Sequence, residues 1–479
     1  MKKYFLTMGA VAILFSCSDE HYEGLNQDPV NPSNVPAGLL VNAATESLFD
    51  QMVNTNVNLN IFRLVAQFWN ETTYVTETNY DLDTRNINGN LWNELYTDVL
   101  YDLKDAKTKI DNDILLTAEE KNNQKAVISI MEVFTWQILV DTFGNVPYSQ
   151  ALLGTENPLP AYDDAATIYG DLMTRLNEAI STISTSSPGF SADYDVIYSG
   201  DMNQWKKLGA SLKLRLAMQL ADVNSSAAST AVSEALSAGV FTSNADNFTI
   251  PYTAGQPTNN PLWDDLVASG RTDFVAANTV VDYMNPLNDP RRPIYFQQNL
   301  GDGVYVGGEY GNPTNYALHT HVGEIFHTPD FPGTLMEYAE VEFLLAEAVE
   351  RGFAVGGSAE SHYNAGIMAS MDYWGVSPSD AAAYLAQSGV AYGSAPGSWK
   401  EKIGKQFWLA MYNNGFIAWN TWRRLDAPTM NVAATTGRTV PFRYTYPALE
   451  GNLNPDNYAA AASAIGGDDI YTKLFWDVN

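Results

Sequence analysis

The recurrence of apolar residues at intervals of three and four constrains the fold more than any other feature of this chain. Such spacing places the apolar side chains on one stripe of an α-helix, and each stripe needs a neighbouring helix to cover it. The sequence therefore predicts helices packed as hairpins between residues 37 and 240. The stripes are Trp92, Leu95 or Tyr96, Val99 and Leu103; Val127, Met131, Phe134 and Ile138; Leu172, Leu176 and Ile180; and Leu208, Leu212, Leu216 and Leu220.

Residues 335–425 continue the helical pattern with a segment that carries two apolar stripes. A helix with two such stripes lies between neighbours, so we expect a central helix here. The fold class is therefore mainly α, an array of helix pairs loosely of tetratricopeptide type, although the strict repeat consensus is missing. The two stripes are Met336, Ala339, Phe343 and Ala346, and Tyr338, Val341, Leu345 and Ala348.

The remaining segments are irregular. Residues 241–334 are rich in Gly, Pro, Asn and Asp, with short β-prone pieces at 248–252 and 303–306, which predicts a loop-rich insert. Residues 426–479 are expected to be irregular as well. We interpret 37–479 as a single domain, with the helical array at 37–240 and 335–425 and binding loops in or near the insert.

The N-terminus has the features of a bacterial lipoprotein leader. Lys2 and Lys3 precede an apolar run that ends at Ser16 and Cys17, the single cysteine of the chain. The run is too short to span a bilayer, and no later stretch is judged long and apolar enough to do so. We therefore predict a signal peptide at 1–16, lipidation of Cys17 and a tether at 17–36. The acidic residues after Cys17 favour a lipid-anchored outer-membrane protein that faces the cell exterior.

The charge balance excludes one class of partner. The chain has 26 basic and 55 acidic residues. Phosphate polyanions would be repelled by this surface. We therefore expect no nucleic-acid partner.

Seven short segments occur in a fixed order along the chain. Together they resemble the SusD/RagB family of nutrient-binding lipoproteins. The segments are Asp-Thr-Phe-Gly-Asn-Val-Pro-Tyr at 141–148, Pro-Ala-Tyr-Asp at 160–163, Asp-Val-Ile-Tyr-Ser-Gly-Asp at 195–201, Asn-Asp-Pro-Arg at 288–291, Ala-Glu-Val-Glu-Phe-Leu-Leu-Ala-Glu-Ala at 339–348, Gln-Phe-Trp-Leu-Ala at 406–410 and Trp-Arg-Arg at 422–424.

The resemblance implies a helical domain with about four helix pairs of tetratricopeptide type. It also implies a cell-surface protein that captures oligosaccharides and delivers them to a TonB-dependent, SusC-like outer-membrane transporter, without catalysis. Two alternatives stay open: a peptide-binding lipoprotein of the same transporter-lid type, and a helical scaffold that binds no small ligand.

Sugar rings need flat aromatic faces beside polar side chains. The family has no motif that assigns these residues, so the candidates are chosen by their polar, loop-like surroundings. Tyrosines and a tryptophan of the 69–86 segment and the insert are expected to supply the faces, and two polar residues the hydroxyl partners. The candidates are Tyr74, Tyr80, Trp263, Tyr305 and Tyr310, with Asp81 and Asn86.

The sequence does not predict catalysis or a metal site. No nucleophile-elbow, zinc-protease or phosphate-loop motif occurs, so an enzyme is not expected. His319, His321 and His327 are interpreted as hydrogen-bonding loop residues, and no metal or cofactor is predicted. The segment 81–85 fails the calcium-loop pattern, although an incidental calcium in an acidic loop remains open. The adjacent Arg423 and Arg424 are expected to be structural, either pairing with acidic neighbours or donating to backbone carbonyls.

Overall fold

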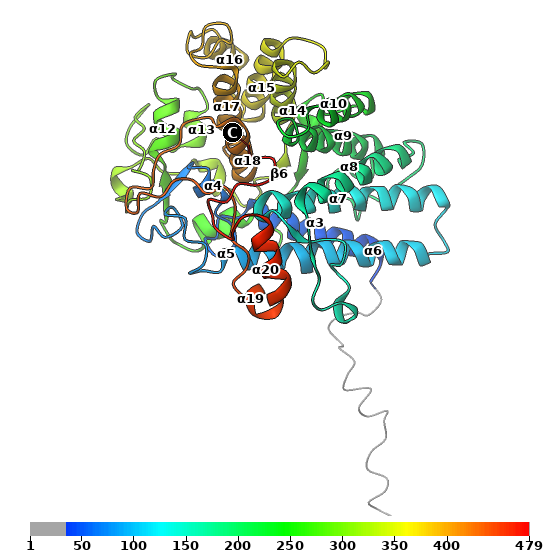
Figure 1. Ribbon diagram of the computed structural model, residues 1–479. Helices are drawn as coiled ribbons and strands as arrows, with labels where there is room; N and C mark the ends of the chain where they lie inside the picture. The colour runs from blue at the N-terminus through cyan, green and yellow to red at the C-terminus, as the bar shows by residue number, and fades with distance from the viewer. Residues whose placement is uncertain (1–34, 479) are drawn as a thin grey trace, which may run out of the picture.

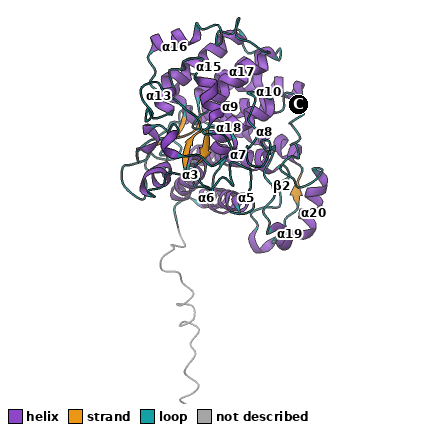
Figure 2. Ribbon diagram, turned by 90° about the vertical axis from the view of Figure 1, so that its left-hand side faces the viewer, coloured by secondary structure: helices purple, strands orange, loops and turns teal. Residues whose placement is uncertain are grey.

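The computed structural model describes residues 35–478, and the predicted signal peptide, Cys17 and most of the tether lie outside them. Helices dominate the described chain, as Figure 2 shows, which confirms the mainly α fold class. The longer helices are α3 (Ala37–Val53), α6 (Tyr101–Asn112), α7 (Ala118–Phe143), α8 (Ala165–Thr182), α9 (Met202–Gln219), α10 (Ser225–Ala238), α14 (Tyr338–Glu350), α15 (Ala359–Tyr373), α17 (Trp399–Ala410) and α18 (Gly415–Leu425).

The helices pack as neighbouring pairs (Figure 1). Within the described residues the array consists of α3 with α6, α7 with α8, α9 with α10 and α14 with α15, in agreement with about four pairs. The pair α17 and α18 packs across the array, with α17 against α14. Helix α14 carries the two predicted stripes except for Met336, which ends the preceding strand, and it contacts α9, α15 and α17, so it is central as expected.

Helix α7 forms the core of the first half of the array. It begins at Ala118, nine residues before Val127, the first residue of its predicted stripe, because Thr117 and Glu120 form a capping box there. It ends at Phe143, before Gly144, whose φ of 85° is one that L side chains rarely adopt. Contrary to the expectation that no later segment could span a membrane, α7 has the length and composition to do so. Its apolar window is 94% buried inside the protein, so it acts here as a core helix.

Shorter elements connect the pairs. Three antiparallel two-stranded sheets pair β1 with β5, β2 with β3 and β4 with β6 in the described chain. They are β1 (Trp69–Glu71), β2 (Val146–Pro147), β3 (Tyr162–Asp163), β4 (Phe248–Ile250), β5 (Phe274–Ala276) and β6 (Gly333–Met336). The short helices are α4 (Phe62–Val65), α5 (Ile87–Asn93), α11 (Pro261–Trp263), α12 (Asn278–Met284), α13 (Arg292–Tyr295), α16 (Pro378–Leu385), α19 (Glu450–Leu453) and α20 (Pro455–Ala464), with 3-10 or π turns η1 (Glu94–Leu100), η2 (Gly154–Glu156), η3 (Asn244–Asp246), η4 (Asp264–Ala268), η5 (Tyr316–Leu318) and η6 (Glu324–His327).

Two local expectations are wrong. The β-prone piece at 303–306 forms no strand, because Val306 pairs only with Thr320, through the backbone and the threonine hydroxyl. The C-terminal segment is irregular over much of its length but contains α19 and α20. Its last residues return to α7, where Trp476 is buried. The other expected strand, at 248–252, is present as β4.

Asp141, near the end of α7, is the point where four parts of the chain meet. Its Oδ1 accepts hydrogen bonds from Tyr169 Oη (2.5 Å) on α8 and Trp476 Nε1 (3.0 Å). Its Oδ2 accepts from Gln137 Nε2 (3.1 Å) and Asn420 Nδ2 (3.0 Å) on α18. Burial raises the pKa of Asp141, and the hydrogen bond from Tyr169 opposes this effect. One carboxyl group thus joins α7, α8, α18 and the C-terminal segment.

Replacing Asp141 with alanine is expected to destabilise the protein by about 3 kcal/mol, because several buried donors lose their acceptor together. Chemical denaturation monitored by circular dichroism measures this change. Asp111→Ala is the control, since the Asp111 side chain is 58% exposed and its ion pair with Lys125 lies at the surface; its effect should stay within about 0.5 kcal/mol. Equal losses in the two variants would contradict the role given to Asp141.

Candidate functional site

Two of the predicted ligand-contacting tyrosines belong to the core. Tyr80 and Tyr310 are each 1% exposed, and their rings lie 5.9 Å apart. Tyr80 Oη accepts a hydrogen bond from Gln67 Nε2 (2.9 Å), and Tyr310 Oη donates to the Leu64 carbonyl (2.7 Å). Neither ring offers a face to solvent. Their assignment as ligand-contacting residues is therefore wrong.

The other predicted rings differ in their exposure. Tyr305 is 7% exposed and lies between Phe296 and the Arg292 guanidinium, so it cannot form a platform either. Trp263 is half-buried at the end of α11. Tyr74 is 65% exposed, the candidate ring with an open face.

Asp81 and Asn86 shape the loop that carries Tyr74. Asp81 accepts hydrogen bonds from the backbone of Asp83 (3.1 Å) and Thr84 (3.0 Å). Partial burial acts to raise the pKa of Asp81, but these hydrogen bonds outweigh it and lower the pKa. Asn86 has a φ of 52° and its amide donates to Asn90 Oδ1 (3.3 Å). The structure therefore gives both predicted hydroxyl partners a local role in holding residues 72–86.

A run of asparagines after α3 forms successive side-chain turns. Asn54 Nδ2 donates to the Asp50 carbonyl (2.7 Å), and Asn54 Oδ1 accepts from the Asn56 backbone (3.0 Å). Asn56 Oδ1 accepts from the Asn58 backbone (3.0 Å), and Asn60 Nδ2 donates to the Met52 carbonyl (2.9 Å). Asparagine closes such turns because its side chain mimics a backbone group. The turns expose polar side chains along one wall of a cleft.

This cleft, called here the asparagine cleft, has a volume of about 310 Å³ and lies between the 54–60 run, the 72–86 loop, η4 and β5. Tyr74 is not a lining residue, but it follows Thr72, whose backbone N–H donates to the Asp273 carbonyl (2.9 Å), and it lies close to Arg271. The hydrogen bond to Asp273, together with the nearby phenol of Tyr74, raises the pKa of Arg271. The cleft is lined by Thr55, Asn56, Val57, Asn58, Arg85, Asp265, Ser269, Arg271, Asp273 and Phe274.

The asparagine cleft is polar and close to neutral. Its charged lining residues are Arg85, Arg271, Asp265 and Asp273, two of each sign in a strongly acidic protein. Arg271 Nη2 donates to Asp273 Oδ1 (3.0 Å), and Asp265 Oδ2 accepts from the Thr55 backbone (3.2 Å). Such a surface suits a ligand rich in hydroxyl and amide groups and without net charge.

A smaller acidic hollow of about 250 Å³ adjoins the cleft and shares Asn56 and Asp265 with it. Burial raises the pKa of Asp265 to about 6, with a nearby Asp264 adding to the effect. Burial also raises the pKa of Asp50 to about 6, although a hydrogen bond from Tyr252 Oη (2.7 Å) opposes this. Within residues 35–478, no three His, Cys, Asp or Glu side chains are grouped to hold a metal ion.

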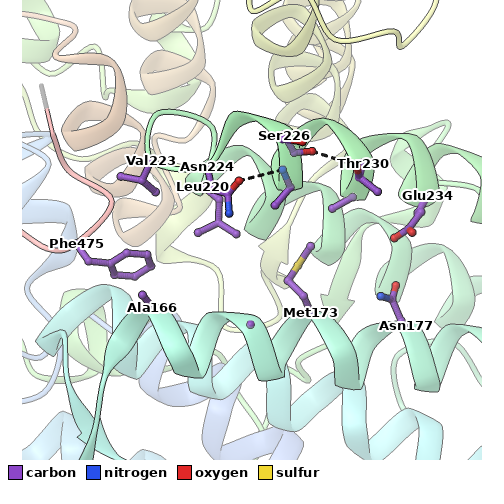
Figure 3. Close-up of a pocket in the computed structure, with 13 residues that line it drawn as sticks. Ala166, Met173, Asn177, Leu220, Val223, Asn224, Ser226, Thr230, Glu234 and Phe475 are labelled. Carbon is purple, nitrogen blue, oxygen red and sulfur yellow. Dashed lines mark hydrogen bonds between the residues drawn. The ribbon is translucent and has the colours of Figure 1, made fainter.

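A larger groove of about 690 Å³ lies between α8 and α10 (Figure 3). Its walls are mainly aliphatic, with Met173 and Leu220 facing each other across it, and the ring that lines it is Phe475. Its polar side chains are already engaged, since Asn224 caps α10 and Glu234 pairs with Lys213. The groove has no exposed tyrosine in its lining and few open polar groups, so the asparagine cleft is the better candidate for a ligand rich in polar groups.

The histidines and the arginine pair behave as predicted. His321 stacks on Tyr316 with ring centroids 3.7 Å apart, and all three loop histidines hydrogen-bond to the chain. Arg424 Nη2 pairs with Glu347 Oε2 (2.9 Å). The Arg423 guanidinium lies over the ring of Trp419 at 3.6 Å and donates to the Phe442 carbonyl (2.7 Å). The structural role expected for both arginines is confirmed.

Several cleft residues were not among the sequence candidates: Asn56, Asn58, Arg85, Arg271 and Asp273. The alternation of asparagines at 54, 56, 58 and 60 is a sequence signal for turns that could have pointed to one wall. No comparable signal marks residues 269–273. They join the cleft only because β5 pairs with β1.

Comparison with known proteins identifies the family. Residues 29–447 match the model of the SusD-like family described as starch-binding and associating with the outer membrane. The match spans most of the chain, so this protein belongs to the SusD-like family. No curated protein sequence matches the chain significantly.

Solved structures agree with this assignment. A chitin-binding protein is 28% identical, with a TM-score of 0.79, and the match covers 92% of this chain and 100% of that one. A chitin-binding SusD homologue from Flavobacterium johnsoniae is 24% identical, with a TM-score of 0.77 and 92% and 99% coverage. A SusD homologue from Bacteroides uniformis has the same identity, TM-score and coverage. At this identity the last two establish the shared fold.

The raised pKa of Asp50 predicts a pH-dependent effect on stability. Its folded-state pKa of about 6 lies above the usual aspartate value of 3.8, so ionisation of Asp50 disfavours the folded state as pH rises through this interval. Asp50→Asn removes that charge while keeping an acceptor for Tyr252. The variant is expected to melt about 1–2 °C higher than the parent at pH 7.5, with no difference at pH 4.

Thermal unfolding at both pH values checks this expectation. Asp83→Asn, a change on an exposed side chain of the 72–86 loop, is the matched control and should shift neither melting temperature. A gain for Asp50→Asn that is as large at pH 4 as at pH 7.5 would contradict the proposed ionisation effect.

Proposed function

We propose that this protein captures uncharged oligosaccharides in the asparagine cleft and performs no catalysis on them. The observation that carries the proposal is an exposed aromatic ring, Tyr74, close to Arg271 of a polar cleft without net charge. The names of the family and of the chitin-binding relatives support a carbohydrate ligand. An N-acetylated or plain glucan chain fits the chemistry of the cleft.

The proposed binding mode follows from the two sides of a sugar ring. The C–H face of one residue packs on the open face of Tyr74. Hydroxyl or acetamido groups of that residue or its neighbours then meet Asn56, Asn58 and Arg85 in the cleft. Asn side chains offer both donors and acceptors, and arginine offers several donors in one plane. The polar side chains of the cleft therefore determine which sugar is bound, and the Tyr74 ring contributes apolar contact area.

A binding role fits the environment of the cleft carboxylates better than hydrolysis. A glycosidase needs one carboxylic acid and one carboxylate facing each other across the sugar. Here Asp273 is paired with Arg271, and Asp265 accepts the Thr55 backbone N–H. We therefore expect purified protein to release no reducing sugar from the glycans it binds.

The proposed cellular setting is the outer surface of the outer membrane. Lipidation at Cys17 would anchor the chain there, and the family description associates these proteins with the outer membrane. We further propose that the captured glycan passes to a TonB-dependent, SusC-like transporter. The bound glycan would then be held over the transporter until transfer.

Tyr74→Ala is expected to weaken binding of chitohexaose or maltoheptaose about tenfold, or ~1.4 kcal/mol, because the sugar loses its stacking surface. Isothermal titration with the form lacking residues 1–17 measures this, after affinity gels have shown which glycan the parent retains. Tyr101→Ala is the matched control, since Tyr101 is 51% exposed on α6, outside the cleft.

Unchanged affinity in Tyr74→Ala, or equal losses in both tyrosine variants, would contradict the cleft as the glycan site. Retention that mixed peptides abolish and glycans do not would favour the peptide-binding alternative. Binding of neither ligand class would favour the scaffold.

A further inference from the structure

Two buried glutamates lie directly beneath the Tyr74 loop. Glu71 ends β1 and is 3% exposed, and Glu77 lies inside the loop and is fully buried. Thr78 donates to Glu71 Oε2 from both its backbone N–H and its hydroxyl, each at 2.9 Å. The Glu77 carboxyl group lies close enough to Glu71 to raise the pKa of Glu71 further than burial does alone. Ionising both of two neighbouring buried carboxyl groups costs much free energy, because the charges repel each other and are shielded from water.

The hydrogen-bond pattern indicates which carboxyl group holds the proton. Glu77 Oε1 accepts from Arg85 Nε, while Glu77 Oε2 is buried and has no N–H or hydroxyl donor among the described residues. A protonated Glu71 supplies the donor that Glu77 Oε2 lacks. Burial, followed by the contact with Glu77, raises the pKa of Glu71 to about 9. At neutral pH, Glu71 is therefore the protonated member of the pair, and Glu77 is the member that forms the ion pair with Arg85.

The charged partner of this pair reaches the asparagine cleft. Arg85 lines the cleft, and its Nη1 lies 3.5 Å from Asn58 Oδ1 on the opposite wall. The Arg85 guanidinium pairs with the buried Glu77 carboxyl group. The Arg85 side chain is about one-third exposed, so the rest of the guanidinium can reach a ligand in the cleft. A single proton on Glu71 thus keeps Glu77 free to hold Arg85.

We propose that Glu71 and Glu77 form a proton-sharing pair that positions Arg85 for hydrogen bonding to the glycan. The inference rests on the proposed function of the cleft. Arg85 would touch the sugar, whereas Glu71 and Glu77 act through it as positioning residues. The pair also fixes the 72–86 loop, because Thr78 in that loop donates to Glu71.

The pair makes binding sensitive to alkaline pH. As pH rises from 4.5 to about 9, the folded loop loses stability, because Glu71 keeps a proton that the unfolded chain releases, and above about 9 Glu71 ionises beside the buried Glu77. The other ionisable groups near the pair are Arg85 from the loop itself, Tyr310 from the insert, and Arg438, whose Nη1 lies 3.4 Å from the Asn79 carbonyl. Strand β5 presents Phe274 opposite Glu71.

Glu71→Gln tests the proton directly, because glutamine supplies a permanent neutral donor at the same place. Its affinity for the glycan that the parent binds should match the parent within about twofold at pH 7. Between pH 7 and 10 the parent should lose about fivefold more affinity than Glu71→Gln. Glu77→Gln, which removes the charge that holds Arg85, should bind about fivefold to tenfold more weakly at pH 7, as should Arg85→Ala.

A measurement without glycan separates this proposal from the function of the cleft. Infrared difference spectra of the parent against Glu71→Gln at pH 7 should show the carbonyl band of a protonated carboxyl group, and the band should vanish by pH 10. If the band is absent, or if Glu77→Gln binds as the parent does while Tyr74→Ala does not, the positioning pair is overturned and the binding site stands. If Tyr74→Ala and Arg85→Ala both bind normally, the cleft function fails, and with it the positioning role.

Discussion

The hydrogen bonds to the buried carboxyl group of Asp141 are the interactions on which the relative positions of the helices most depend. The helix pairs contact one another mainly through apolar stripes, which fix distance better than register. Directional hydrogen bonds from α8, α18 and the C-terminal segment converge on this one group. These hydrogen bonds fix the positions of α8, α18 and the C-terminal segment relative to α7 at this junction. The C-terminal residues are far from α7 in sequence, but the hydrogen bond from Trp476 holds them against α7.

Buried ion pairs tie the two halves of the array together. Arg215 on α9 pairs with Glu340 on α14, with Nη2 and Oε2 2.8 Å apart, and Arg424 on α18 pairs with Glu347, also on α14. Buried pairs contribute little net stability, but removing one partner leaves an uncompensated charge. They therefore favour one mutual arrangement of α9, α14 and α18. The acidic excess of the chain lies mostly outside these pairs, on the solvated surface.

The helical array could be predicted from the sequence because apolar periodicity and core burial reflect the same physical requirement. The two stripes in this region predicted a central helix, and its contacts with α9, α15 and α17 confirm that position. The binding residues could not be predicted in the same way. Tyr74 and Tyr80 lie six residues apart in one polar loop, yet one is exposed and the other is covered by Tyr310 and Gln67. Contacts with the insert, which is distant in sequence, cause this difference in exposure. The sequence around either tyrosine has no pattern that predicts these contacts.

The assembly of the asparagine cleft shows the same limit. One wall comes from local asparagine turns, which the alternating residues at 54–60 encode. The other comes from residues 269–273, brought there by a three-residue pairing of β1 with β5. A short strand pair of this kind is specified by tertiary contacts more than by propensity.

The side-chain turns of the 54–60 run have a kinetic consequence. Their backbone groups are satisfied by Asn54, Asn56 and Asn60 before any ligand arrives, so the wall needs no ordering step on encounter. Association at a ready-made wall is limited by diffusion and orientation, and affinity is then set by the rate of escape. A wall that is already ordered favours fast uptake of a ligand. Fast exchange of the ligand would fit the proposed transfer of a captured glycan to a transporter.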